Sequence, residues 1–207
     1  LAYWQGLPWH RVRQLPEDAP SARNIVGAER AFALELDAVL TEQLLTLAPS
    51  AYRTQVNELL LVALARALLR WAGPGVVRVD VEGHGREDLF AGVDVSSTVG
   101  WFTTQYPVLL ELEQPPLGEH IPRVKAQLRA LPNHGIGFGS LRYLGEPAAR
   151  RALERLPSAQ LRFNYLGQFA AAWRTSSPLL GAAQGRTEDS GLGAQHALTN
   201  HRSHELE

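Results

Sequence analysis

The sequence predicts an α/β two-layer sandwich, because segments with strand patterns alternate along the chain with segments that have helix patterns. Residues 76–81 form a valine-rich run, which indicates a buried strand, and residues 54–72 are apolar nearly all round, which indicates a buried helix. The chain has 207 residues, of which 45% are hydrophobic. It is therefore long enough to bury one sizeable core.

The first part of the chain is expected to hold an irregular segment, one strand and two helices. Residues 1–30 are interrupted by prolines and are expected to lack regular structure. Apolar side chains alternate with small or polar ones over residues 32–36, which is a strand pattern, and Thr41 is expected to cap a short helix through Leu47. The long helix over residues 54–72 should end at the Gly-Pro pair that follows it.

The rest of the chain continues the alternation. The expected elements, in order, are a strand over residues 76–81, a strand over 108–112, a helix over 121–128 that stops before Pro132, a helix near 147–156 and a strand over 161–165. Residues 181–195 are rich in Gly, Ala and Ser and are expected to be loop or disordered.

The composition excludes several classes of function. A net charge of −1 argues against a nucleic-acid surface, and no apolar run of 18 residues is present that could cross a membrane. The absence of cysteine excludes a disulfide framework and a zinc-thiolate site, and it fits a soluble protein of the reducing cytoplasm. Lys125 is the only lysine and lies in an ordinary amphipathic helix pattern, so a Schiff-base cofactor is not expected. His196, His201 and His204 lie in a loose tail, and no metal site is expected there.

The most informative stretch for chemistry is residues 80–87, Asp-Val-Glu-Gly-His-Gly-Arg-Glu. It places Glu82 at the end of the valine-rich strand, where Gly83 and Gly85 free the backbone. Partial desolvation at such an edge raises the pKa of a carboxylic acid toward the range in which it exchanges protons near neutral pH. Taken alone, however, the same stretch is also typical of a surface turn.

Five ordered blocks extend this observation over nearly the whole chain. They are residues 51–60, residues 82–87, residues 94–103 with Tyr106-Pro107, residues 135–139 with 141–144, and residues 163–168, Phe-Asn-Tyr-Leu-Gly-Gln. In these blocks the chain resembles the epimerization domains of nonribosomal peptide synthetases. The resemblance implies a chloramphenicol-acetyltransferase-like fold, of which residues 1–207 would be the C-terminal lobe. The N-terminal lobe, with its paired-histidine motif, is expected to precede this sequence, which would be cut at both ends.

The chemistry that the resemblance implies is inversion of the α-carbon of an aminoacyl or peptidyl thioester. The thioester would be carried on the phosphopantetheine arm of a carrier protein, next to neighbouring synthetase modules, and no intrinsic cofactor is expected. Removing and returning the α-proton needs an acid/base group on each face and polar groups that hold the enolate oxygen. By resemblance, Glu82 is one acid/base group, Asn164 and Tyr165 lie near the enolate, and the other acid/base group belongs to the missing lobe.

Three further residues are candidates for binding the substrate or the arm. Arg86 matches the arginine of the family motif and could position Glu82 or steady negative charge, although an exposed arginine without a catalytic role is an equal alternative. Trp101 could line the channel for the arm, but an aromatic pair such as Trp101 and Phe102 is first expected to be packing. Ser97 stands where the family usually has arginine, which puts arm binding in doubt.

Two other interpretations remain open from the sequence. A glycine-rich block over residues 135–139 lacks the following lysine of a phosphate-binding loop, so close backbone packing is expected instead. The function itself has alternatives, which are a condensation-type acyltransferase of the same superfamily and a non-catalytic carrier-docking module.

Overall fold

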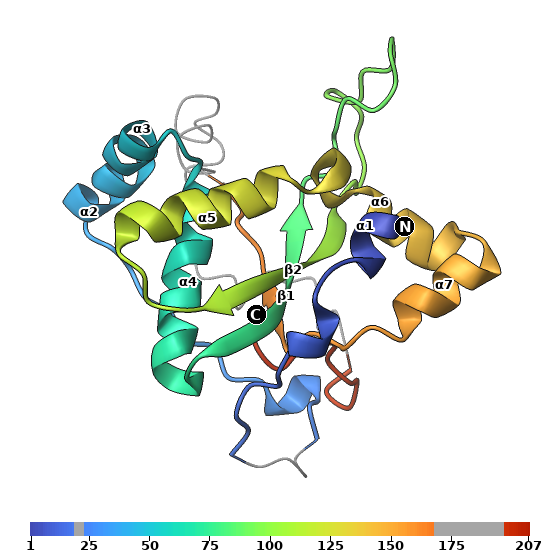
Figure 1. Cartoon of the computed structure of the whole chain (residues 1–207), viewed down its shortest axis with the longest axis horizontal. Helices are drawn as coiled ribbons and strands as arrows, with labels where there is room; N and C mark the ends of the chain where they lie inside the picture. The colour runs from blue at the N-terminus through green and yellow to red at the C-terminus, as the bar shows by residue number, and fades with distance from the viewer. Residues whose placement is uncertain (19–22, 168–196) are drawn as a thin grey trace.

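The centre of the molecule is a three-stranded sheet with the order β2-β1-β3. A computed structural model of the chain describes residues 1–18, 23–167 and 197–207. Strand β1 (Gly75–Gly83) pairs antiparallel with β2 (Thr104–Leu112) along its whole length and parallel with the short β3 (Leu161–Phe163) (Figure 1). All three strands occur where the hydrophobic patterns predicted them.

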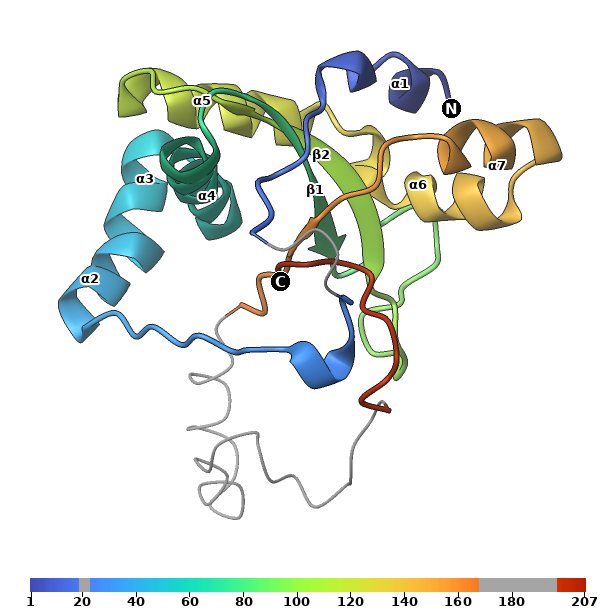
Figure 2. The same ribbon diagram turned by 90° about the horizontal axis from the view of Figure 1, so that it is seen from below.

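Two long helices cover one face of this sheet. Helix α4 (Val56–Ala72) and helix α5 (Leu117–Arg129) lie on the same side of β1 and β2 (Figure 2). Helix α4 begins with a capping box, in which the Glu58 side chain accepts a 2.8 Å hydrogen bond from the Gln55 backbone N–H. It ends at Gly73, whose φ of 77° is a conformation that glycine adopts without strain.

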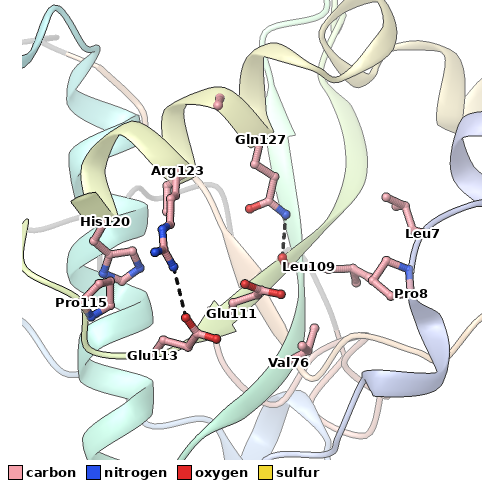
Figure 3. Close-up of a pocket in the computed structure, with 12 residues that line it drawn as sticks. Leu7, Pro8, Val76, Leu109, Glu111, Glu113, Pro115, His120, Arg123 and Gln127 are labelled. Carbon is pink, nitrogen blue, oxygen red and sulfur yellow. Dashed lines mark hydrogen bonds and ion pairs between the residues drawn. The ribbon is translucent and has the colours of Figure 1, made fainter. Parts of the chain in front are cut away.

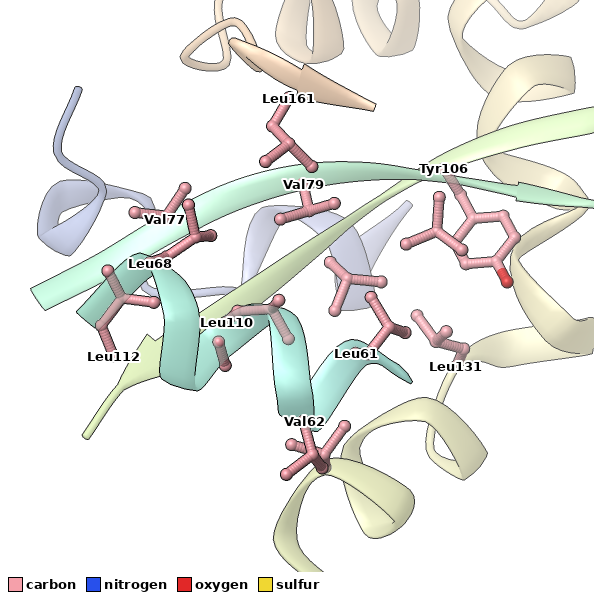
Figure 4. Close-up of a cluster of buried hydrophobic side chains, with 14 of the residues drawn as sticks. Leu61, Val62, Leu68, Val77, Val79, Tyr106, Leu110, Leu112, Leu131 and Leu161 are labelled. Atoms are coloured by element: carbon pink, nitrogen blue, oxygen red, sulfur yellow. The ribbon is translucent and has the colours of Figure 1, made fainter. Parts of the chain in front are cut away.

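The hydrophobic core lies between this sheet face and the helices. Alternate residues of β1, among them Val77 and Val79, point toward Leu61 and Leu68 of α4, and Leu110 of β2 lies beside them (Figure 4). This alternation follows from the two-residue period of a strand. It leaves the intervening residues of β1 on the opposite face of the sheet.

That opposite face is polar along β1 and carries the residues that matter for the site. Arg78, Asp80 and Glu82 occupy its alternate positions. The C-terminal segment 197–207 runs along the outer edge of β3, where Leu206 forms a parallel bridge with Leu161, and its His204 side chain reaches Asp80 on this face. The sheet therefore has one apolar face under helices α4 and α5, and one face that is polar along β1 and borders a cavity also lined by Phe138, Arg142 and Glu154.

Shorter helices surround this centre. Near the N-terminus the ring of Trp4 packs edge-on against Phe138, at 5.0 Å between centroids. The short helices are α1 (Ala2–Gln5), α2 (Ala38–Glu42), α3 (Ala48–Tyr52), α6 (Gly137–Gly139) and α7 (Pro147–Glu154). Single 3-10 or π turns are found at Trp9–Arg11, Val26–Ala28, Gln43–Leu47, Pro132–Gly135 and Ser140–Leu144.

Three local predictions in the first part of the chain are wrong. Residues 1–30 do not lack regular structure, since they hold helix α1 and two 3-10 turns. Residues 32–36 form no strand, and Phe32 is 92% exposed, because no neighbouring strand is present to pair with this segment in the described structure. The short helix after it is capped by Asp37, whose carboxylate accepts a 2.8 Å hydrogen bond from the Leu40 N–H, so Thr41 lies inside the helix. Asp37, four residues before Thr41, is the side chain that accepts the hydrogen bond at the start of this helix.

Other boundaries move by a few residues. Helix α5 begins at Leu117, before the predicted start, and β3 ends at Phe163, before the predicted end. The predicted close packing of the glycine block holds at Gly135, where a side chain would overlap the Tyr106 ring, but it is wrong for Gly137 and Gly139, which face open space. The loop predicted over residues 181–195, together with His196, lies outside the described residues.

Candidate functional site

Glu82 lies near the end of β1, on the polar face of the sheet. Its cross-strand neighbour is Gln105 of β2, and its side chain is 17% exposed. One carboxylate oxygen, Oε1, lies 3.4 Å from the guanidinium of Arg162. The strand therefore presents the carboxylate in a half-enclosed position next to a positive charge.

Asn164 and Tyr165 lie immediately beyond the neighbouring strand. Since β3 runs parallel to β1 and Phe163 pairs with Val81, Asn164 follows β3 at the level where Glu82 follows Val81. Asn164 is exposed and Tyr165 is half-buried. The carboxyl ends of the two parallel strands thus bring these predicted residues to one edge of the sheet, although Asn164 follows Glu82 by 82 positions in the chain.

The arginine that faces Glu82 is one that sequence reasoning missed. Arg162 lies in β3 and pairs in register with Asp80, so it shares the polar face with Glu82. The signal that could have found it is its place between Leu161 and Phe163, since alternation in a strand sends it to the side opposite the core.

Arg86, the arginine that the sequence singled out, is used differently. Its guanidinium donates hydrogen bonds to the carbonyl oxygens of Val95, of Thr98 at 2.8 Å and of Gly100 at 3.4 Å. It also lies over the Phe102 ring, 4.3 Å from the centroid. In these contacts Arg86 holds the loop between β1 and β2 rather than the carboxylate of Glu82.

This loop, residues 84–103, carries the other two candidate binding residues. Ser97 is exposed, and Trp101 is 97% exposed, so the prediction that Trp101 would first of all be packing is wrong. The two ends of the loop approach closely, because Gly85 has a φ of 68° and a side chain there would overlap the Phe102 carbonyl oxygen. The loop is therefore tied at its base and presents Trp101 to the outside.

A buried polar cluster adjoins Glu82 on the same sheet face. Arg78 donates to Asp80 at 2.8 Å, and Asp80 also lies 3.3 Å from Nε2 of His204 in the C-terminal segment. Counted over whole residues, all three are less than one-tenth exposed. They form one wall of a cavity of about 560 Å³ whose other wall includes Phe138 and Arg142. The cluster joins the C-terminal segment to the sheet.

A second cavity lies on the outer side of β2 and α5. Its volume is about 430 Å³, and it is bordered by Glu111, His120 and the ion pair of Arg123 with Glu113 (Figure 3). Burial lowers the pKa of His120, and the nearby charges of Arg66 and Arg123 lower it further. This cavity lies away from Glu82 and shares no lining residue with the first one.

The described part of the chain holds neither a cluster of metal ligands nor a helix that could span a membrane. Within the described ranges, no group of three or more His, Asp or Glu residues is arranged to hold a metal ion. No helix in that part of the chain is long and apolar enough to cross a membrane.

Comparison with known proteins places this arrangement in a family. A model of the condensation domain matches residues 1–193. A linear gramicidin synthase protein of Brevibacillus parabrevis is 44% identical over 180 residues, which are 86% of this chain and 4% of that protein. The chain therefore spans only a small part of the curated relatives it matches.

Solved structures agree with this placement. The crystal structure of the epimerization domain from the third module of tyrocidine synthetase B superposes with a TM-score of 0.75 and 38% identity, covering 82% of this chain and 39% of that one. The nonribosomal peptide synthetase FmoA3 superposes with a TM-score of 0.52 and 27% identity, covering 81% of this chain and 18% of that one. The predicted α/β fold of the chloramphenicol-acetyltransferase type is thereby confirmed, and the chain belongs to the condensation-domain superfamily of nonribosomal peptide synthetases.

Proposed function

We propose that this chain is the C-terminal lobe of an epimerization domain, which inverts the α-carbon of an aminoacyl or peptidyl thioester from L to D. The observation that carries the proposal is that Glu82 lies at the end of β1 and that Asn164 and Tyr165 follow the adjacent parallel strand β3. Ligands of α/β sheets commonly bind outside the carboxyl ends of such strands.

The reaction needs only proton transfers, and its atoms balance without an oxidant or reductant. One group takes the α-proton, the electron pair of the C–H bond moves into an enolate of the thioester, and a second group returns a proton to the opposite face. We assign Glu82 to one of these roles. The second group belongs to the N-terminal lobe, so the reaction takes place in the cleft between the lobes.

The enolate oxygen needs hydrogen-bond donors where negative charge develops. The Tyr165 hydroxyl and the Asn164 amide are donors, and both follow β3 next to the end of β1. The similarity to the tyrocidine synthetase epimerization domain supports this assignment. The substrate is carried on the phosphopantetheine arm of a carrier protein from the same synthetase, and the reaction uses no other cofactor.

The exposed part of the loop between β1 and β2 is our candidate contact for the arm. Trp101 offers an aromatic surface, and Ser97 offers a hydroxyl, at the position where a longer side chain is usual in epimerization domains. Arg86 contributes to arm binding indirectly, since its three carbonyl contacts hold this loop.

A second candidate function is that of a condensation-type acyltransferase, which forms a peptide bond. The match of residues 1–193 to the condensation-domain model supports it. In that reaction a carboxylate at position 82 has no assigned role. A third possibility, a non-catalytic docking module for carrier proteins, has no role for Glu82 either.

The test is α-proton exchange by the complete domain, in which this chain is joined to its N-terminal lobe. Solvent deuterium uptake into a carrier-bound aminoacyl thioester is followed by mass spectrometry. Glu82→Gln should slow uptake by about 100-fold or more, as the loss of a positioned acid/base group does. Glu111→Gln, which removes a carboxylate from the far end of the same sheet face, is the matched control and should leave uptake unchanged.

The outcomes separate the three functions. Deuterium uptake by the wild type that depends on Glu82 supports epimerization. Peptide-bond formation without uptake identifies an acyltransferase, and carrier binding without either reaction identifies a docking module. Uptake at the wild-type rate by Glu82→Gln would remove this residue from the mechanism.

A further inference from the structure

We infer that Arg162 is a positioning residue for the reaction, which holds the carboxylate of Glu82 in the orientation that proton transfer needs. The inference rests on the proposed function, because it assigns a partner to the acid/base group of that site. It goes beyond that function by naming a residue from a different strand as the one that orients Glu82.

The strand register places Arg162 for this role. It pairs with Asp80 across the parallel β1–β3 ladder, so its side chain leaves the sheet on the polar face, like those of Asp80 and Glu82. The preceding residue, Leu161, is 5% exposed and belongs to the core on the other face. A core residue thus fixes which way the arginine points.

The guanidinium uses both of its terminal nitrogens. Nη1 lies 3.4 Å from Oε1 of Glu82, and Nη2 donates a 2.5 Å hydrogen bond to Oε2 of Glu207. Glu207 lies in turn 3.9 Å from Arg202. A planar guanidinium can hold two carboxylates at fixed angles, whereas an ammonium group is a point charge without that geometry.

This arrangement limits the rotation of the Glu82 carboxylate. Arg162 is 30% exposed and Glu82 is 17% exposed, so the pair is only partly open to water and is less screened than a surface pair. Because Oε1 is held by Arg162, Oε2 is the oxygen that we assign to the proton transfer. A carboxylate that is free to rotate would spend part of its time in unproductive orientations.

The groups assigned to the enolate follow directly after the same strand. Asn164 and Tyr165 follow Arg162 within three residues, at the end of β3. One short strand therefore positions both the acid/base carboxylate and the hydrogen-bond donors. Arg86 cannot substitute for Arg162 in this structure, because its guanidinium is engaged by the carbonyl oxygens of the loop.

The experiment measures deuterium uptake by the complete domain at varied concentrations of carrier-bound thioester. Arg162→Gln should lower kcat by about 10-fold to 100-fold, since a misplaced group of this kind costs up to about 100-fold, and should leave KM unchanged. Arg162→Lys should recover part of kcat because it keeps the positive charge. Arg11→Gln removes an ion pair with Glu111 at the far end of the sheet and should leave both constants unchanged.

A double variant distinguishes positioning from a structural role. If Arg162 acts through Glu82, then Arg162→Gln should change kcat by less than about 2-fold when Glu82→Gln is already present, because the two residues act as a unit. An equal loss in both backgrounds would overturn the inference. Arg162→Met keeps the stem of the side chain and gives the same measurement if Arg162→Gln does not fold.

The remaining outcomes separate this inference from the proposed function. If Arg162→Gln keeps the wild-type kcat, or raises KM with kcat unchanged, the positioning role is overturned. The proposed function still holds in that case, provided that Glu82→Gln slows deuterium uptake. Uptake at the wild-type rate by Glu82→Gln would remove both Glu82 and Arg162 from the mechanism, whereas no uptake by the wild type would overturn the proposed function itself.

Discussion

The first prediction concerns the contribution of the buried ion pair between Arg78 and Asp80 to stability. The two side chains are 5% and 12% exposed, and the Nε to Oδ1 distance is 2.8 Å. Asp80→Asn keeps the shape of the side chain but leaves the Arg78 guanidinium buried without a compensating carboxylate. We expect this substitution to destabilise the domain strongly.

The magnitude follows from the burial of the pair. Breaking a buried ion pair by removing one partner costs about 3–5 kcal/mol of unfolding free energy. For a chain of this size about 1 kcal/mol corresponds to about 2–4 °C in Tm, so the melting temperature should fall by about 6–20 °C.

The structure also offers a control ion pair that is exposed. Arg11 and Glu111 are also 2.8 Å apart, but each is 48% exposed. Such a pair contributes about 0.2–1 kcal/mol, so Glu111→Gln should lower Tm by less than about 4 °C.

Differential scanning calorimetry of the wild type and the two variants makes the comparison. Combining Asp80→Asn with Arg78→Met, which removes the uncompensated charge, should restore part of the loss. The reasoning is refuted if Asp80→Asn lowers Tm no more than Glu111→Gln does.

Two further predictions concern single side chains. Burial lowers the pKa of His120 below its ordinary value of 6.5, so the unfolded chain binds a proton that the folded chain does not. The stabilisation from keeping this group neutral is fully present above pH 6.5 and is lost as the pH falls through the folded pKa. Urea unfolding between about pH 5 and about pH 8 should therefore show stability declining toward acid, and His120→Gln should reduce this slope. An unchanged slope would contradict the assignment. In the second prediction, Tyr165→Phe should slow deuterium uptake by about 100-fold because only the hydroxyl donor is lost, while the far-ultraviolet spectrum and Tm stay close to the wild type. A large fall in Tm with unchanged uptake would make Tyr165 structural instead.

Much of the fold could be predicted from local patterns. The helix over residues 54–72 and the three strands are strongly periodic or strongly apolar, and each occurs where it was expected. The segment over residues 32–36 has the same alternation but forms no strand, because a strand is stabilised by its neighbour and not by its own pattern. The alternation of apolar and polar residues predicts which side chains share a face, but it does not predict whether a partner strand is present.

For the site, the sequence could determine the candidate residues but not their partners. The position of Glu82 after a valine-rich run predicted its place at a strand end, and the Asn164-Tyr165 block predicted a second strand end. That the two strands are parallel neighbours follows only from the tertiary structure. The partners of the two arginines also follow only from the tertiary structure, since Arg86 donates to carbonyl oxygens of the loop and Arg162 pairs with Glu82. The physical reason is that an ion pair depends on distance in space, and residues 80 positions apart approach one another only when the sheet brings their strands together.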